Sequence, residues 1–385
     1  MLNLEKQVFH HLEKASNILI VFAINPNGAA GSGDALASSL ALYAFLKKIG
    51  KTVDITTQKK GENLNNLSFL PSFSEIKSSL DNLRRFIVSV NISQAKIHNI
   101  RYTIDKDQLN FIISPKNGWF KPEDVSAKAG EFRYDLIVVI GAVDLESLGE
   151  IYDNNIEFFY KTTIINIDHQ TANEEFGQIN YIDVNAVATA EVVFFLLKNF
   201  HPESLDEKIA TCLLAGIIQQ TKNFKTANLT PRTLLTTSEL LDRGADREKI
   251  VDHLYRSRDI NSLKLWGRIL NNLKTENSNA LLWSALSATD FQETASSPDK
   301  LADLIDELIA NVPDAKLVAI IYEIGPNKAG LSLFSLKNLN ALELLQDFSP
   351  TGSRKNASAM LNEDYRSAAK KIVARLKSAL DKISL

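Results

Sequence analysis

The stretch Thr163–Gln170 reads TIINIDHQ, an apolar run that ends in an aspartate, a histidine and a glutamine. The apolar residues predict a buried strand, so Asp168 and His169 should lie at its carboxyl end. Open α/β sheets place their functional groups at that edge. A carboxylate beside an imidazole suits a catalytic metal ion, whereas the amide of Gln170 is a poor ligand for one. The stretch therefore predicts an α/β fold with an incomplete metal site.

Alternating strands and helices surround this stretch. Unbroken apolar runs predict strands over residues 18–23, 53–57, 135–141 and 163–167. Helical spacing of apolar residues predicts helices over 36–49, 189–199, 206–219, 231–243 and 247–255, with a longer helix ending near Leu273. This order is typical of a parallel sheet with helices on both faces.

Residues 80–132 interrupt that order. Residues 85–90 and 109–113 have the composition of strands and are separated by polar stretches, which predicts an inserted β segment. The polar run 274–279 has the composition of a linker. Beyond it, strands over 280–283, 317–323 and 331–336 and a helix from Asn362 onward predict a smaller α+β domain. We therefore expect one domain over 1–273 and a second over 280–385.

The overall composition excludes several classes of protein. A chain of 385 residues is long enough for two domains, and a net charge of −3 gives no general reason to bind nucleic acid or acidic lipid. The single Cys212 rules out an intramolecular disulfide framework, and its apolar neighbours predict a buried, inert thiol. The first residues do not form a signal peptide, and no apolar run approaches the length of a membrane span. We expect a cytoplasmic protein with no membrane partner.

Separated segments of the chain resemble the motifs of the DHH phosphoesterases, both in their order along the chain and in their residues. The similarity is to the bacterial type with a DHH-associated C-terminal domain, which cuts very short RNAs and removes phosphate from pAp. It covers nearly the whole chain and is carried by Ser32–Leu42, Tyr134–Gly149, Asn166–Gln170 with Thr189–Glu191, Leu214–Phe224 with Leu229–Thr233 and Arg243–Asp246, and Phe348–Ala359.

The resemblance implies two-metal hydrolysis, in which two divalent ions, usually manganese, activate a water molecule and stabilise the phosphoryl oxygens. Of the ligands that the family offers, this chain keeps Asp34, Asp168 and His169. The other motif positions carry residues that bind metals poorly or not at all: Ser32 and Gly141 for aspartates, Gln170 for a histidine, Gln220 for an aspartate and Lys222 for a glycine. Three ligands could hold one ion weakly but not two firmly.

The resemblance also assigns substrate contacts to Ser38, and to Gly352, Arg354 and Lys355 in the C-terminal domain. Two interpretations are open for Lys222: its ammonium replaces the metal charge in an ion pair with Asp34 or Asp168, or it points to solvent. Two are also open for the loop Gly28–Gly33, which either holds a phosphate on backbone N–H groups or is a plain turn.

Three hypotheses for the function follow. The first is a DHH-like protein that has lost hydrolysis, needs no cofactor and binds or scaffolds a nucleotide or short RNA. The second is a phosphoesterase for short oligonucleotides or pAp with an altered manganese or magnesium site. The third is a structural partner protein with a closed cleft. The resemblance further makes a homodimer plausible.

Overall fold

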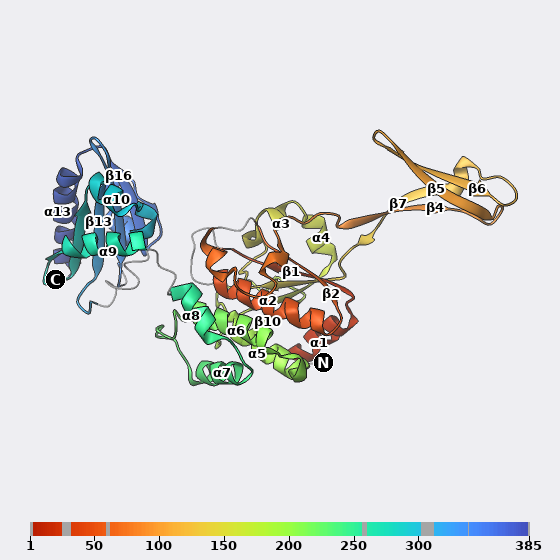
Figure 1. Ribbon diagram of the computed structural model, residues 1–385, viewed down its shortest axis with the longest axis horizontal. Coiled ribbons are helices and arrows are strands. Elements are labelled where there is room, and N and C mark those ends of the chain that lie inside the picture. The colour runs from red at the N-terminus through yellow and green to blue at the C-terminus, as the bar shows by residue number, and fades with distance from the viewer. Residues whose placement is uncertain are drawn as a thin grey trace. The chain divides into compact units, whose positions relative to one another are not determined.

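A computed structural model describes residues 3–24, 32–58, 62–255, 260–301, 312–337 and 339–383. The chain divides into two compact units, residues 1–256 and 257–385 (Figure 1). The first unit is an α/β domain, and the second is a smaller domain built on one mixed sheet. This architecture confirms the predicted fold class.

The first unit contains the elements that the alternating pattern predicts. Its helices are α1 (Leu4–Lys14), α2 (Ser32–Lys48), α3 (Glu150–Asp153), α4 (Ile156–Lys161), α5 (Thr189–Phe200), α6 (Glu207–Gln220), α7 (Pro231–Asp242) and α8 (Arg247–Tyr255). The strands of its main sheet are β1 (Asn17–Phe22), β2 (Thr52–Thr56), β3 (Ile76–Lys77), β8 (Leu136–Ile140), β9 (Thr163–Asp168) and β10 (Ile179–Ile182).

The main sheet has the order β10-β9-β8-β1-β2-β3, and every strand pair in it is parallel. The chain builds outward from β1 in one direction and from β8 in the other, so the order reverses between these two strands. In open α/β sheets, ligands bind beyond the carboxyl ends of the strands at such a reversal. Phe22 of β1 pairs with Ile140 of β8 at this point.

Alternate residues of the central strands face two different helical layers. In β1, Ile18 and Ile20 contribute to a core with α1, α2, α5 and α6. Leu19 and Val21 face the opposite way, into a core with α3 and α4 that contains Phe158 and Phe159. Helices therefore cover both faces of the sheet, which explains the continuous apolar strands.

The predicted insertion is an arm of paired strands between β3 and β8. It contains β4 (Arg84–Val90), β5 (Ile97–Asp105), β6 (Gln108–Pro115) and β7 (Val125–Phe132). Antiparallel pairing joins β4 to β7 and β5 to β6, so the arm consists of two successive two-stranded ribbons. The inserted β segment is confirmed, with two strands more than the sequence pattern indicated.

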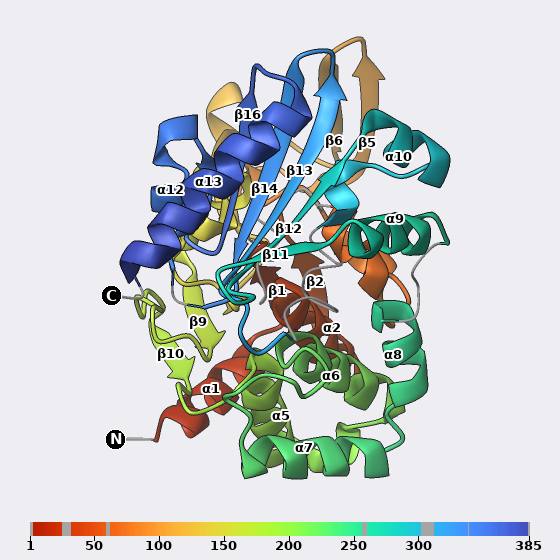
Figure 2. The ribbon, with the colours of Figure 1, turned by 90° about the vertical axis from the view of Figure 1, so that its left-hand side faces the viewer.

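The second unit contains a sheet of order β11-β12-β13-β14-β16-β15. Its strands are β11 (Lys274–Glu276), β12 (Leu281–Leu286), β13 (Leu317–Gly325), β14 (Lys328–Ser335), β15 (Thr351–Gly352) and β16 (Asn356–Leu361), and its helices include α9 (Ile260–Asn271), α10 (Ala288–Thr294), α12 (Ala341–Leu344) and α13 (Tyr365–Ile383). Helix α13 packs on one face of this sheet and α9 on the other (Figure 2).

The predicted linker over 274–279 is wrong for its first half. Lys274–Glu276 form β11, which pairs antiparallel with β12, so these residues belong to the second sheet. Helix α9, which we expected to end the first domain, lies in the second compact unit. A short polar edge strand has the same composition as a linker, which is why the pattern misled.

Two smaller expectations can also be compared with the structure. Cys212 is fully buried in α6, so the predicted burial of its thiol is confirmed, and burial raises the pKa of the thiol to about 12. Among the helices within the described residues, none is long and apolar enough to cross a membrane.

Candidate functional site

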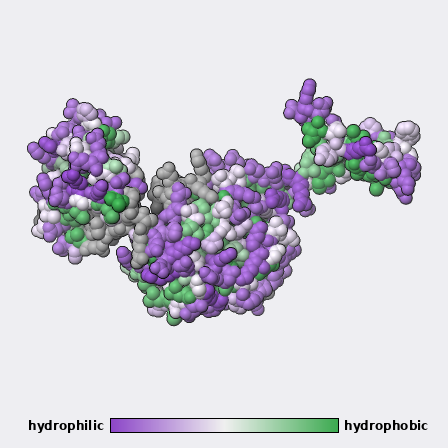
Figure 3. All heavy atoms as spheres, in the orientation of Figure 1, coloured by the Kyte–Doolittle hydropathy of each residue, from purple (hydrophilic) through white to green (hydrophobic). Residues whose placement is uncertain are grey.

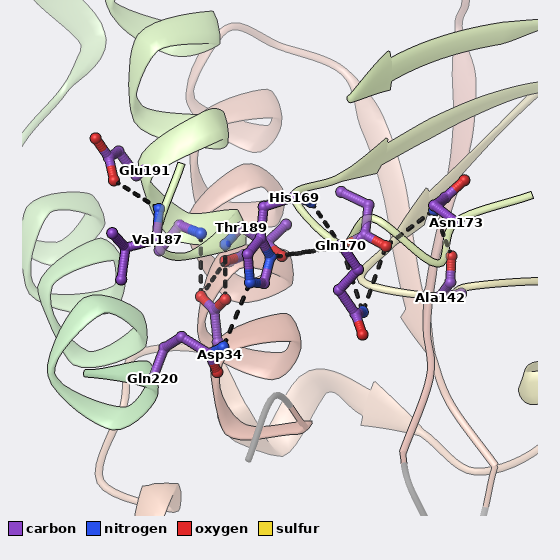
Figure 4. A network of polar contacts seen from close by, with 12 residues as sticks. Asp34, Ala142, His169, Gln170, Asn173, Val187, Thr189, Glu191 and Gln220 are labelled. Carbon is purple, nitrogen blue, oxygen red and sulfur yellow. Dashed lines mark hydrogen bonds and ion pairs between the residues drawn. The ribbon is translucent and has the colours of Figure 1, made fainter. Parts of the chain in front are cut away.

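The three residues predicted as metal ligands meet at the carboxyl edge of the main sheet. Asp34 lies in the first turn of α2, which follows β1, and Asp168 is the last residue of β9. Thr189 begins α5 and contacts both groups (Figure 4). The three residues Asp34, Asp168 and His169 are thus gathered near the reversal in strand order.

Asp34 is fully buried and caps helix α5. Its Oδ2 accepts a hydrogen bond from the backbone N–H of Thr189 at 2.7 Å, and its Oδ1 accepts one from the N–H of Ala190 at 3.0 Å. The residue that precedes the helix, Ala188, makes no side-chain cap. Asp34 therefore supplies, from another helix, the acceptor that a helix N-terminus requires.

Asp168 is also fully buried and surrounded by donors. Its Oδ1 accepts a hydrogen bond from the backbone N–H of His169 at 2.7 Å, and its Oδ2 accepts one from Asn173 Nδ2 at 2.9 Å. Gln170 Nε2 lies 3.3 Å from the same Oδ2. The amide at position 170 thus faces Asp168 as a donor, where a histidine of the family would face a metal ion.

His169 connects the carboxylates to helix α6. Its Nδ1 lies 2.9 Å from Thr189 Oγ1 and 3.5 Å from Asp168 Oδ1, and its Nε2 lies 3.3 Å from Gln220 Nε2. The resemblance would place a metal-binding aspartate at the position of Gln220. Its Oε1 is buried and, among the described residues, finds no hydrogen-bond partner.

The surroundings shift the three ionisable groups in different directions. Burial raises the pKa of Asp34, although the charge of His169 and the two backbone N–H groups oppose the shift. Burial also disfavours ionised Asp168, but hydrogen bonds from His169 and Asn173 outweigh it and lower the pKa of Asp168. Burial would lower the pKa of His169, but its hydrogen bond to Asp168 and the nearby carboxylate charges raise it. Asp168 and His169 therefore each favour the charged form of the other.

Close packing surrounds these polar groups. Gly141, which directly follows β8, has a φ of +64°, and a Cβ atom there would lie 2.7 Å from Ala35 Cβ. At Gly216 of α6, a Cβ atom would lie 2.8 Å from Asp34 Oδ1 and 2.7 Å from Ala190 Cβ. The position of the family's strand-end aspartate thus has no room for a side chain.

Comparison with known proteins identifies the family. Residues 17–217 match the description "DHH family, N-terminal domain". The chain belongs to the DHH family. One DHH relative is the bifunctional oligoribonuclease and PAP phosphatase NrnA of Thermus thermophilus, 37% identical over 108 residues, which are 28% of this chain and 33% of that protein.

Other relatives match this DHH chain over different shares of their length. The cyclic-di-AMP phosphodiesterase PdeA of Listeria monocytogenes is 26% identical over 226 residues, 57% of this chain and 32% of that protein. The matches thus cover about one third of the length of these two curated relatives. A solved exopolyphosphatase-related protein of Bacteroides fragilis has a TM-score of 0.67 at 18% identity and covers 98% of this chain and 96% of its own. That likeness shows the fold alone.

The donor set of this DHH protein does not fit a pair of divalent ions. Such ions need several anionic ligands, whereas amides at 170 and 220 and a glycine at 141 stand where the resemblance would place ligands. Both oxygens of Asp34 already accept hydrogen bonds from backbone N–H groups. Within the described ranges, no group of three or more His, Cys, Asp or Glu side chains could hold a metal ion.

The remaining predicted positions are spread over both units. Ser38 is buried and donates a hydrogen bond to Asp34 Oδ1 at 3.2 Å. Ser32 is buried at the start of α2, whereas residues 25–31 of the glycine-rich segment lie outside the described residues. Gly352, Arg354 and Lys355 are exposed beside the β15–β16 pair of the second unit.

Lys222 lies in a left-handed turn that follows α6. The φ angles of Lys222, Asn223 and Phe224 are +48°, +58° and +65°. This left-handed conformation favours glycine, which is the residue that the resemblance would place at position 222. Within the part of the chain that the structure describes, the hydrogen bonds to Asp34 and Asp168 given above come from other residues. His169 Nδ1 lies 3.5 Å from Asp168 Oδ1.

The sequence patterns missed two groups that shape the site. Asn173 donates to both Asp168 Oδ2 and the carbonyl of Ala142, and its place in an irregular loop gave no signal. Glu191 is fully buried and accepts a hydrogen bond from Arg232 Nε at 2.6 Å, which joins α5 to α7. A glutamate in the first turn of an apolar helix is a signal that could have predicted a cationic partner.

Proposed function

We propose that this DHH protein binds a nucleotide or a short oligonucleotide, or scaffolds one, without two-metal hydrolysis. The observation that carries the proposal is the bonding of Asp34. A metal ion bound there would have to displace the N–H groups of Thr189 and Ala190, which lie 2.7 and 3.0 Å from its carboxylate. Two buried donors would then be left without acceptors, which is costly.

The relatives support the class of ligand. The Thermus protein is named for action on oligoribonucleotides and PAP, and the Listeria protein for action on cyclic di-AMP, so phosphorylated nucleosides are the shared chemistry. In this chain Arg354 and Lys355 are exposed cations next to each other, suited to an anionic ligand. A nucleotide held by such groups needs no metal ion.

A second candidate is a phosphoesterase with an altered manganese or magnesium site. The names of the relatives favour it, because each describes a hydrolytic enzyme. The lowered pKa of Asp168 also keeps one carboxylate ionised at neutral pH. In that case Asp168 and His169 would hold a single ion.

Calorimetric titration with pAp and with a dinucleotide, in EDTA and in manganese, tests the proposal. We expect binding that EDTA leaves unchanged and no nucleotide product in either buffer. Arg354→Ala should weaken binding by about tenfold. Lys328→Ala, which removes another exposed cation of the second unit, is the matched control and should leave affinity unchanged.

Thermal unfolding of Asp34 variants separates the two candidates. If Asp34 caps α5, Asp34→Ala should destabilise the protein by about 1–3 kcal/mol, and Asp34→Asn by less, because the amide keeps one acceptor oxygen. Manganese should not change these melting temperatures. Manganese-dependent hydrolysis that Asp168→Ala abolishes would establish the second candidate instead.

A further inference from the structure

The arm between β4 and β7 carries an uncovered apolar face. In the outer ribbon, the cross-strand pairs Ile100–Ile113, Tyr102–Phe111 and Ile104–Leu109 have their side chains on one face. Tyr102 is 68% exposed, Ile104 72% and Phe111 52%. Figure 3 shows apolar residues in green on this arm.

The opposite face of the outer ribbon is largely polar. It carries Arg101 paired with Ile112, Thr103 with Asn110 and Asp105 with Gln108. In the inner ribbon, Phe86, Val88 and Val125 are also exposed apolar residues, and their cross-strand partners are alanines or valine. Each ribbon thus has one face without charge.

A two-stranded ribbon with an apolar face exposed to water is unfavourable. An isolated two-stranded ribbon is only marginally stable, and a third layer or further strands are needed to cover its apolar face. Contiguous exposed apolar patches of several hundred Å² mark interaction sites. Since an aromatic side chain can bury about 150–250 Å², the outer face offers on the order of 600 Å² and the inner ribbon about 300 Å² more.

We propose that the apolar face of the outer ribbon packs against the same face of a second copy of the chain. The outer face alone offers on the order of 600 Å² per copy, which is most of the ~800 Å² per partner of a stable interface. Two amphipathic ribbons placed face to face would form a four-stranded sandwich about 10 Å thick, with the polar faces outward. With a two-fold axis, both copies bury the same surface. This surface can pair with itself because it carries no charge.

The absence of charge on this face selects against other occupants. A nucleic acid would need cations directed at it, but Arg101 lies on the opposite face of the outer ribbon. An acidic or basic protein surface would leave its own charges unpaired against Tyr102 and Phe111. A second copy of the chain offers an apolar face that matches this one. It is also always present at the same concentration as the arm.

Sedimentation velocity of the full chain, over a concentration series, tests the proposal. We expect a dimer for the wild type, and at least a hundredfold weaker dimerisation for Phe111→Asp. The matched control is Asn110→Asp, which places the same charge on the neighbouring residue and the opposite face, and which should remain a dimer. Ile104→Asp and Thr103→Asp form a second pair of the same design.

Near-ultraviolet circular dichroism and the melting temperature confirm that each variant keeps the folded body. A wild type that is monomeric at every concentration would overturn the proposal, as would a Phe111→Asp or Ile104→Asp variant that still dimerises. Equal dissociation of the apolar-face and polar-face variants would also overturn it. So would a monomeric wild type that co-sediments with phosphatidylcholine–phosphatidylserine vesicles, since the face would then bind lipid.

Discussion

Gly141 shows at the scale of one residue why a side chain is disfavoured where the resemblance would place an aspartate. Its φ of +64° and the 2.7 Å approach of Ala35 both oppose a side chain. We expect Gly141→Ala to destabilise the protein by about 2–4 kcal/mol, through left-handed strain plus overpacking. The change in free energy of unfolding in urea measures the cost.

Gly50 provides the control for this prediction. Its φ is +85°, but a Cβ atom there would have no neighbour within 4 Å. Gly50→Ala should therefore cost only the strain, about 1 kcal/mol. Equal costs at the two positions would show that the contact with Ala35 relaxes freely and that the site has room for a side chain.

Individual residues of the site were only partly predictable. The sequence placed Asp168 and His169 at a strand end, and Asp34 after another strand, because parallel strands bring their carboxyl ends to one edge. It could not predict that Asp34 caps α5, since that bond joins residues 155 positions apart along the chain. The hydrogen bond from Asn173 depends in the same way on the folded loop.

Asp54 joins several elements at the base of the arm. This β2 residue accepts hydrogen bonds from Lys77 Nζ at 2.7 Å, Arg133 Nη2 at 2.9 Å and the Tyr134 hydroxyl at 2.7 Å. Burial would raise the pKa of Asp54, but the hydrogen bonds from Lys77 and Tyr134 and the charges of Lys77 and Arg133 outweigh it and lower the pKa. The ionised carboxylate therefore ties the main sheet to the segment that leads into the arm.

Asp54→Asn should destabilise the protein by about 1–2 kcal/mol at pH 7, since both cations are partly exposed. A lowered pKa means that the ionised group stabilises the fold above its ordinary value of 3.8, and that this stabilisation is lost as the pH falls through the folded-state value. The difference between wild type and Asp54→Asn in urea unfolding should thus shrink below about pH 4.

A matched change at Asp81 checks the interpretation. Asp81 is exposed and accepts a hydrogen bond from nearby Ser79. Asp81→Asn should change stability by less than about 0.5 kcal/mol at either pH. A difference for Asp54→Asn that stays constant from pH 7 to pH 3 would contradict the role of its charge.

Elements were predicted more reliably than the connections between them. The apolar runs of β1, β8 and β9 and the helical spacing of α5 and α6 agree with the structure to within a few residues. The arm was predicted as strands, but its length was not, because β5 and β7 alternate weakly with polar residues. The strand β11 was mistaken for a linker because its three polar residues show no alternation of apolar and polar side chains.

At the scale of the whole molecule, the division between the two units depends on which core α9 completes. Leu265, Trp266 and Ile269 of α9 are buried against Leu282, Val318 and Ile320 of the second sheet. Ser284 Oγ also donates a hydrogen bond to the carbonyl of Ile269 at 3.2 Å. We expect the fragment 260–385 to fold alone, with a cooperative urea transition.

The fragment 274–385, which begins at the sequence-predicted linker, is the control for that boundary. Without α9, one face of its sheet would lose three large buried side chains, at about 1.5–3 kcal/mol each. This loss is comparable to the total stability of a domain, about 5–15 kcal/mol, so we expect no cooperative transition. If 274–385 instead unfolded as cooperatively as 260–385, α9 would be dispensable for the second domain, and the boundary would lie after it.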